Sequence, residues 1–482
     1  MRRLAAIVLA WMALVTAVAA AGGVPLRGVA LVIGEAHYAG LPALKNPPSD
    51  AAAIGGLLGR LGFAVTPVAD ADHAALAAAL EKFALAAKDA DVALVYYSGH
   101  GLEAGGENYL VPVDADLSSP AKAGAGLVSV SGWLDDLAKA VPVTIVLLDA
   151  CRTGAFPRGT AIIPPGADAP VPAAEAGLAV MRGPTPVARA DFAPDSLGMV
   201  IGFAASPGQP ALDGAPGEAN SPYAAALLRH LGAGGYSFSD VMTMVTQEVY
   251  LKTKARQLPW VNSSLMRVLT FGKADAAADE DSALIATGRR SLLLKIASVP
   301  EASRQTAETV AGVEDAPLDQ VYGVLTALGE DGSDPTQHDD LLRVAVERTR
   351  AVTQEPASSG LGAEVDHDLG LAQAAWVEGA FDVALTFRDR AVATARSAAV
   401  GGTDDVRRRF AALLASTAEA QWSLFRLQAA AALYADAENA VADFDAGLAR
   451  CEVAAVAGGP DAVLADVFDQ IGIPAANPGA AG

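Results

Sequence analysis

Two residues of this 482-residue chain combine a side chain suited to nucleophilic chemistry with a position at the end of an apolar run. His100 stands between two glycines, directly after the apolar residues 92–97, and Cys151 ends the apolar stretch 141–151. An imidazole beside a thiol accepts its proton, and the resulting ion pair lowers the thiol pKa from ~8.5 to about 4–7. The two residues therefore predict a cysteine nucleophile with a histidine base, provided that the fold brings them together.

The elements that must position this pair alternate between strand and helix. Apolar runs closed by small or polar residues predict five strands, at residues 28–34, 63–68, 92–97, 141–151 and 198–206. Amphipathic patterns predict helices at residues 49–62, with Ser49 or Asp50 as N-cap, and at residues 70–91. Such alternation predicts an α/β fold with a mostly parallel sheet and helices on both faces. Because ligands and chemistry in such sheets collect at the carboxyl ends of the strands, His100 and Cys151 are expected at one edge.

Each of the two residues alone has an ordinary structural explanation. A lone histidine at a strand end usually serves the fold, and a lone buried cysteine usually packs as a small apolar residue. Their occurrence together at two strand ends, with the spacing typical of caspases, favours a Cys–His site. The backbone N–H groups of Gly101 and Cys151 would then face the oxyanion of a tetrahedral intermediate. The other histidines show no metal-ligand spacing, so neither a metal nor a cofactor is predicted.

Three stretches of the sequence resemble the catalytic domain of the caspase-like cysteine peptidases, in the bacterial branch near the metacaspases. They are YYSGHG, GENYLVPVDADL and VTIVLLDACRTGAF, and the resemblance extends over residues 24–272. It implies that His100 is the general base and Cys151 the nucleophile, with the Gly101 and Cys151 amides as oxyanion hole. The family includes members activated by calcium, and nothing in this sequence indicates such activation.

The resemblance also bears on the substrate. Caspases have glutamine two residues before the catalytic cysteine and cleave after aspartate, whereas this chain has Asp149 there. Metacaspase-like members line the pocket for the P1 side chain with acidic residues, and Asp149 and Asp50 match those positions. Two carboxylates would bind an arginine or a lysine, with arginine preferred for its bidentate geometry. The alternatives are that Asp50 only caps its helix and that Asp149 only orders a loop. Trp260 matches an aromatic residue of the substrate groove, although a place in the core is an equal alternative.

The N-terminus is predicted to be a signal peptide covering residues 1–22. Arg2 and Arg3 precede an apolar run that ends in small residues, which is typical of a cleaved leader. An uncleaved membrane anchor is the alternative, because the run is about as long as a minimal spanning helix. Both predict export, with a periplasmic or secreted protein in the first case and a membrane-anchored one in the second.

The charge and the cysteine content limit the partners. The chain has 34 Lys and Arg against 55 Asp and Glu, a net charge of −21, which argues against nucleic acid and anionic membranes as partners. Cys151 and Cys451 are the only cysteines, too few for a disulfide framework. We expect Cys451 to be a packing residue, with a disulfide between the two as the less favoured alternative.

The second half of the chain has a different composition. After residue 272 an acidic linker is predicted at 273–283, then a helical, alanine-rich domain at 284–472, and a disordered tail at 473–482. Residues 375–391 are similar to a tetratricopeptide motif, although an ordinary helical bundle fits nearly as well. This half shows no catalytic constellation, so we expect it to bind a protein partner. A fragment of residues 24–272 is accordingly expected to fold alone.

Two functions remain open from the sequence. The first is an active cysteine endopeptidase that acts on proteins or peptides with a basic P1 residue. The second is an inactive caspase-like scaffold that acts through protein–protein contacts of its helical domain. The intact pair of His100 and Cys151 favours the endopeptidase. Residues 156–196, between the fourth and fifth strands, are rich in proline, alanine and glycine and predict a loop.

Overall fold

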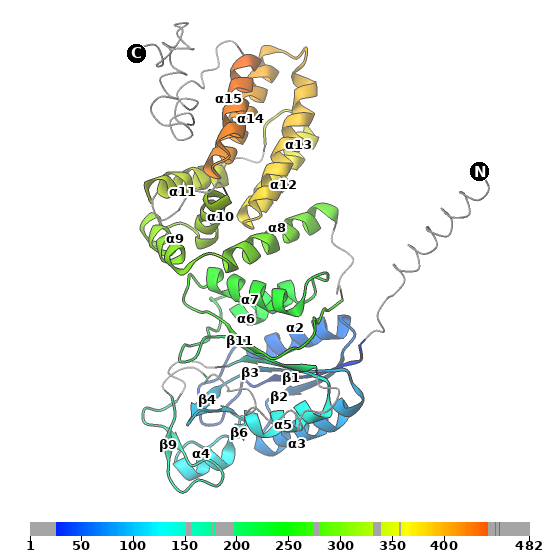
Figure 1. The fold of residues 1–482 in the computed structure, drawn as a ribbon, viewed down its shortest axis with the longest axis vertical. Helices are drawn as coiled ribbons and strands as arrows, with labels where there is room; N and C mark the ends of the chain where they lie inside the picture. Colours follow the sequence, from blue (N-terminus) through cyan, green and yellow to red (C-terminus); the bar gives the residue numbers. More distant parts are fainter. Residues whose placement is uncertain are drawn as a thin grey trace, which may run out of the picture. The chain divides into compact units, whose positions relative to one another are not determined.

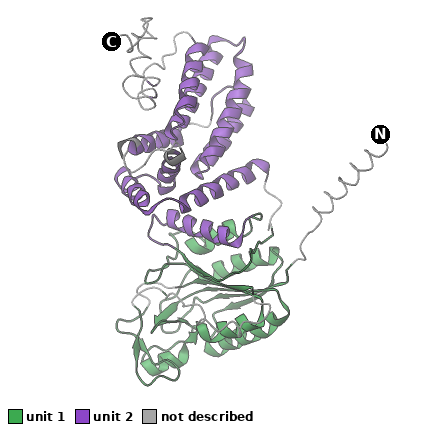
Figure 2. Cartoon of the chain, viewed as in Figure 1, with its two compact units in different colours: residues 1–235, 259–274 green, residues 236–258, 275–482 purple. Residues whose placement is uncertain are grey.

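The computed structural model (Figure 1) describes residues 26–150, 156–174, 178, 197–272, 279–330, 339–355, 358–441, 449 and 453. The chain divides into two compact units (Figure 2), one of residues 1–235 and 259–274, the other of residues 236–258 and 275–482. Cys151, Cys451, the signal peptide expected at 1–22 and the tail expected at 473–482 lie outside the described residues. Over the described part of the chain, no helix has the length and apolarity needed to span a bilayer.

A six-stranded sheet forms the centre of the first unit. Its strands are β1 (Gly28–Gly34), β2 (Ala64–Ala69), β3 (Val92–Ser98), β7 (Val143–Asp149), β10 (Gly198–Phe203) and β11 (Trp260–Ser263). They lie in the order β11-β10-β7-β3-β1-β2, and every pair is parallel except β10 with β11. The five predicted strands and the mostly parallel sheet are therefore confirmed. The antiparallel edge strand β11 was not expected.

Helices cover both faces of this sheet, as predicted (Figure 1). One face carries α2 (Pro47–Arg60) and α6 (Pro222–His230), and the other carries α3 (His73–Ala86) and α5 (Val130–Ala140). Alternate residues of the strands pack with the apolar side chains of α3 and α5 in one buried cluster. Helix α2 begins at Pro47 with Asn46 as its N-cap position, so the expected N-caps Ser49 and Asp50 lie inside the first turn.

Shorter elements complete the first unit. They are η1 (Ala87–Asp89), β4 (Gly101–Ala104), β5 (Glu107–Leu110), α4 (Pro120–Gly126), β6 (Val128–Ser129), β8 (Ala161–Ile162) and β9 (Val171–Pro172). The antiparallel strands β4, β5 and β6 form a three-stranded sheet, and β4 begins directly after His100. Strands β8 and β9 pair within the region 156–196 that was predicted to be a loop. The described part of that region therefore contains a short strand pair.

The second unit is helical. Its helices are α7 (Phe238–Lys252), α8 (Glu280–Ala297), α9 (Glu301–Glu314), α10 (Leu318–Glu330), α11 (Asp339–Gln354), α12 (Ala363–Val377), α13 (Phe381–Ala399), α14 (Asp404–Ser423) and α15 (Leu427–Ala440). Gly379, with φ +71°, makes the turn between α12 and α13, which pack against each other. Helix α7 belongs to this unit although it precedes residue 272, so the division differs from the expected one at residues 236–258.

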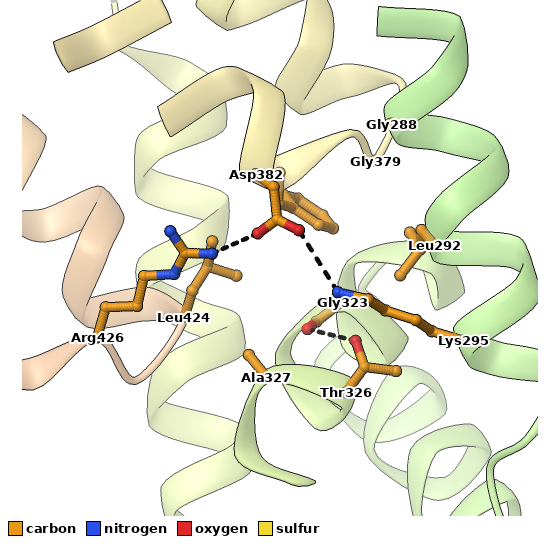
Figure 3. Close-up of a pocket in the computed structure, with 11 residues that line it drawn as sticks. Gly288, Leu292, Lys295, Gly323, Thr326, Ala327, Gly379, Asp382, Leu424 and Arg426 are labelled. Carbon is orange, nitrogen blue, oxygen red and sulfur yellow. Dashed lines mark hydrogen bonds and ion pairs between the residues drawn. The ribbon is translucent and has the colours of Figure 1, made fainter. Parts of the chain in front are cut away.

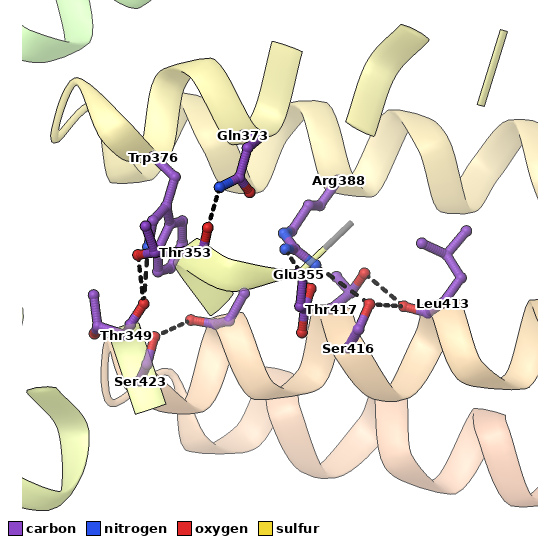
Figure 4. A network of polar contacts seen from close by, with 11 residues as sticks. Thr349, Thr353, Glu355, Gln373, Trp376, Arg388, Leu413, Ser416, Thr417 and Ser423 are labelled. Atoms are coloured by element: carbon purple, nitrogen blue, oxygen red, sulfur yellow. Dashed lines mark hydrogen bonds and ion pairs between the residues drawn. The ribbon is translucent and has the colours of Figure 1, made fainter. Parts of the chain in front are cut away.

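Polar contacts join the helices of this unit. Arg388 donates to Glu355 at 2.7 Å and to the Ser416 hydroxyl at 3.3 Å (Figure 4). In a small hollow between α8, α10 and α13, the Asp382 carboxylate accepts from Arg426 and lies 3.5 Å from Lys295 Nζ (Figure 3). Both arrangements pair each charge with an opposite one. For Arg388, whose side chain is 5% exposed, such pairing is the condition for burial.

Candidate active site

His100 and the residue before Cys151 lie at the same edge of the sheet. Strands β3 and β7 are neighbours, and Ser98 at the end of β3 lies opposite Asp149 at the end of β7. The Gly99 N–H donates to the Asp149 carbonyl at 3.3 Å, so the two chains stay paired beyond the strands. Cys151 itself lies outside the described residues, two positions after Asp149. The register thus brings Ala150, the last described residue before position 151, to the edge of the sheet where His100 lies.

The two glycines that flank His100 are required by close contacts. A Cβ atom on Gly99 would lie 2.7 Å from the Tyr97 hydroxyl oxygen and 2.8 Å from that of Tyr38. A Cβ atom on Gly101 would lie 2.8 Å from Ala150 Cβ. Contacts that short would force the backbone on either side of the histidine to move. The Gly-His-Gly sequence therefore lets the imidazole lie in a tightly packed corner of the sheet edge.

The hydrogen bonds of His100 fix its ring and its tautomer. Its Nε2 lies 2.8 Å from the Pro42 carbonyl oxygen, and its backbone N–H donates to the Tyr38 hydroxyl at 2.7 Å. A carbonyl can only accept, so Nε2 carries the hydrogen and Nδ1 is the basic nitrogen of the neutral ring. Tyr38 and Phe156 also contact the imidazole, with ring centroids at 4.5 and 6.0 Å, and the residue is 1% exposed. The arrangement suits a general base that acts through Nδ1.

A buried acid lies one strand away from the histidine. Glu35 follows β1, and its N–H donates to the Ser98 carbonyl at 2.9 Å, while its carboxyl accepts from the Ala71 N–H at 2.8 Å. Burial raises the pKa of this carboxyl to about 8, and the nearby charges of Asp70 and Asp114 add to the shift. Its second oxygen, Oε1, has no hydrogen-bond partner among the described residues. Glu35 is therefore protonated at neutral pH.

Asp50, the first residue of the expected acidic pair, is fully buried at the start of α2. Its carboxylate accepts from the Ser98 hydroxyl at 3.2 Å, from the Asn220 amide at 2.9 Å and from the Ser221 N–H at 3.0 Å. It makes no side-chain cap for α2, so the alternative that it only caps this helix does not apply. Instead Asp50 ties the end of β3 to the start of α6.

Asp149, the second residue of the pair, is also fully buried and shares a partner with Asp50. The Ser221 hydroxyl donates to Asp149 Oδ2, which also accepts from the Tyr96 hydroxyl at 3.4 Å. The hydroxyl of Tyr223 is buried without a partner in the part of the chain that the structure describes, and the Asp149 charge helps to raise its pKa after burial itself. The structure thus brings the two carboxylates together around Ser221.

Trp260 lies at the same edge of the sheet. It begins β11 opposite Phe203, the last residue of β10, and Phe203 in turn pairs with Leu148 of β7. The Trp260 residue is 43% exposed, so it is not a core residue. Exposed aromatic surface beside a site is typical of a binding surface.

Among the described residues, no group of three or more His, Cys, Asp or Glu side chains is arranged to hold a metal ion. The partners of the predicted residues were not expected from the sequence. They are Ser98, Asn220, Ser221 and Tyr96 beside the two carboxylates, and Tyr38, Pro42 and Phe156 beside His100. Ser-Pro at 221–222 is a signal for a helix start, and Ser221 does cap α6. That signal gives no hint of the second contact, from the Ser221 hydroxyl to Asp149.

Comparison with known proteins identifies the family. The peptidase C14 caspase domain matches residues 27–270, about half of the chain. The chain belongs to the caspase-domain family. This confirms the resemblance drawn from the motifs around His100 and Cys151. The match covers the whole six-stranded sheet and helix α7.

Similar proteins include one human and one mouse protein. The human mucosa-associated lymphoid tissue lymphoma translocation protein 1 and its mouse homolog are each 32% identical over 124 residues, which is 26% of this chain. The chain spans only 15% of the length of these relatives. Among solved structures, caspase-1 from Spodoptera frugiperda is 19% identical, with a TM-score of 0.37 over 53% of this chain and 93% of its own. A protein from Geobacter sulfurreducens, also 19% identical, has a TM-score of 0.35 over 52% and 96%.

Proposed function

We propose that this caspase-domain protein is a cysteine endopeptidase with a Cys151–His100 dyad. The observation that carries the proposal is the hydrogen bond from His100 Nε2 to the Pro42 carbonyl, which leaves Nδ1 as the base. The register of β3 and β7 supports it, because it brings Asp149 and Ala150, the two residues before Cys151, to the sheet edge that holds His100. An inactive scaffold is not favoured, since both residues of the dyad are present and the imidazole is held in the tautomer whose Nδ1 can accept a proton.

The proposed reaction is acyl transfer in two steps. His100 Nδ1 takes the thiol proton, and the Cys151 thiolate attacks the carbonyl carbon of the scissile peptide bond. The Gly101 and Cys151 N–H groups donate to the oxyanion that forms. The protonated His100 gives its proton to the leaving amine, and the C–N bond breaks to leave a thioester on Cys151. Water, deprotonated by His100, then hydrolyses the thioester and restores the free thiol.

For the substrate we propose a basic P1 side chain, with arginine preferred over lysine. Asp50 and Asp149 are both buried, and the hydrogen bonds described above come from neutral donors. These are the Ser98, Ser221 and Tyr96 hydroxyls, the Asn220 amide and the Ser221 N–H. A guanidinium has five N–H donors and a full charge, so it would replace the Asn220 and Ser221 donors with stronger ones. An aspartate at P1 would add a third negative charge beside two, which is costly.

The test is turnover of fluorogenic peptides that differ only at P1, with arginine, lysine, alanine or aspartate. We expect cleavage after arginine, then lysine, and none after aspartate. Cys151→Ala should lower kcat/KM by several orders of magnitude, since dyad residues act as one unit. Cys451→Ala is the matched control and should leave turnover unchanged. Near-normal turnover by Cys151→Ala would show that the proposed chemistry is wrong.

A further inference from the structure

Helix α7 is part of the caspase domain by sequence and part of the helical unit by its packing. It lies within residues 27–270, which match the caspase domain, yet it belongs to the helical unit. The chain therefore passes between the two units three times, after residues 235, 258 and 274. If the acidic segment 273–283 were the only connection, the chain would pass between the units once. The additional two passages place α7 inside the helical unit.

Helix α7 is buried on nearly all sides. Its buried residues are Phe238, Val241, Met242, Met244, Val245, Gln247, Glu248, Val249, Tyr250 and Leu251. A helix that is buried around most of its circumference needs neighbours on most sides to be stable. Helix α8 of the helical unit packs directly against it.

A buried ion cluster fixes α7 to the helical unit. Arg289 of α8 donates to both carboxylate oxygens of Glu248 of α7, at 3.0 and 3.3 Å. The same guanidinium donates to Asp319 of α10 at 3.0 Å and to the Glu378 carbonyl at 3.1 Å. Arg289 is 1% exposed and Glu248 3% exposed. Removing one partner of such a pair would leave an uncompensated buried charge.

A second set of contacts joins the C-terminal part of α7 to α9 and α10. The Tyr250 hydroxyl donates to Glu308 of α9 and lies 3.1 Å from the Tyr322 hydroxyl of α10. Arg304 of α9 donates to the Gln247 amide oxygen at 3.3 Å. Helices α8, α9 and α10 thus each supply at least one polar partner to α7.

We propose that α8, α9 and α10 form an internal docking surface whose ligand is α7. The helical region then holds the caspase fold by one of that fold's own helices, in addition to the covalent linker. Residues 253–259 are all that separates α7 from β11, so the docked helix also restrains the strand that begins with Trp260. The docking does not depend on the proposed function, because it involves neither His100 nor Cys151.

The test uses the full chain with a site-specific protease sequence inserted between Ala274 and Asp279. Cys151→Ala is included so that no activity of the chain itself cuts it. After cleavage we expect the two fragments to elute together in size-exclusion chromatography at micromolar concentration. Hydrogen exchange of residues 253–263, measured by mass spectrometry, should stay as slow as in the uncut chain.

Substitutions in the ion cluster should weaken the association. Arg289→Ala should weaken fragment binding ~100-fold or more and speed exchange at residues 253–263, because Glu248 and Asp319 lose their cation. Glu248→Gln keeps the shape of the side chain and serves if Arg289→Ala fails to fold. Arg396→Ala removes an exposed ion pair of the same unit, with Asp436, and is the matched control.

Three results would overturn the proposal. One is separate elution of the fragments of the cleaved chain without denaturant. Another is binding by Glu248→Gln as tight as that of the Arg396→Ala control. The third is a hydrogen-exchange rate at residues 253–263 that stays the same when α7 no longer binds to α8–α10. None of these results depends on peptidase turnover, so a failure of the proposed function would be seen separately, in the peptide assay.

Discussion

Glu35→Gln should remove a pH dependence from the stability of the first unit. Burial raises the pKa of the Glu35 carboxyl to about 8, whereas the same group titrates near its ordinary value of 4.5 in the unfolded chain. Between those values the folded chain holds a proton that the unfolded chain has released. The free energy of unfolding therefore falls as pH rises through this window. Below this pH window Glu35 is protonated in both states. Above pH 8 it is ionised in both, and the free energy of unfolding falls no further on its account.

The size of the effect follows from the width of the window. Each pH unit inside it lowers the free energy of unfolding by about 1.4 kcal/mol. Between pH 5.5 and 7.5 the wild-type chain should thus lose ~2–3 kcal/mol that the variant keeps. Glutamine has nearly the same shape, does not titrate and retains an oxygen for the Ala71 N–H. We therefore expect the variant to be the more stable protein at pH 7.5.

The assay is urea unfolding at the two pH values, followed by pulsed hydrogen exchange and mass spectrometry of residues 28–34 and 92–98. Following these strands isolates the first unit, since the whole chain need not unfold in one step. Glu81→Gln changes an exposed glutamate of α3 and is the matched control. A difference between Glu35→Gln and wild type that stays constant within about 0.5 kcal/mol from pH 5.5 to 7.5 would refute the reasoning.

Three further predictions concern the proposed site and the unit boundary. Asp50→Asn and Asp149→Asn should each lower kcat/KM for arginine peptides ~30-fold or more. Asp135→Asn of α5 is the exposed control, and an equal loss of kcat/KM on alanine peptides would contradict a P1 role. His100→Ala should abolish turnover as fully as Cys151→Ala while the circular dichroism spectrum is unchanged, and a tenfold loss or less would contradict the dyad. The sequence predicts that residues 24–272 fold alone, but the contacts of α7 lead us to expect the opposite. This fragment keeps α7 without α8–α10, so it should bind the dye ANS and aggregate, and a monomeric fragment with sharp NMR signals would contradict this.

The strands were predictable because each carries its own signal. Buried parallel strands are apolar on both faces, so residues 28–34 and 92–97 are recognisable without knowledge of their neighbours. Strand β11 has only four residues and is partly exposed, which leaves no such run. Its place is set by pairing with β10, and this is a long-range contact that local sequence does not encode.

The start of α2 was misplaced for a different reason. Ser49 and Asp50 are good N-cap residue types, but Pro47 precedes them. Proline is favoured in the first helical turn, where its fixed φ suits the helix and its missing N–H is not needed. The Asn-Pro pair at 46–47 was thus the better signal. The misplaced start also hid the role of Asp50, whose carboxylate faces Ser98 and Asn220 rather than its own helix.

The placement of α7 shows what a sequence pattern cannot supply. Ten residues of α7 are buried in the structure, so the helix has neighbours on most sides. The sequence of α7 does not say which helices these neighbours are. Glu248 is the informative residue, because a buried carboxylate needs hydrogen-bond donors or a cation to compensate its charge. That cation is Arg289, 41 residues later and beyond the acidic segment that looked like a linker. A buried pair of opposite charges on either side of a presumed boundary is therefore evidence against cutting the chain there. In this protein the charge pair and the buried circumference of α7 lead to the same conclusion.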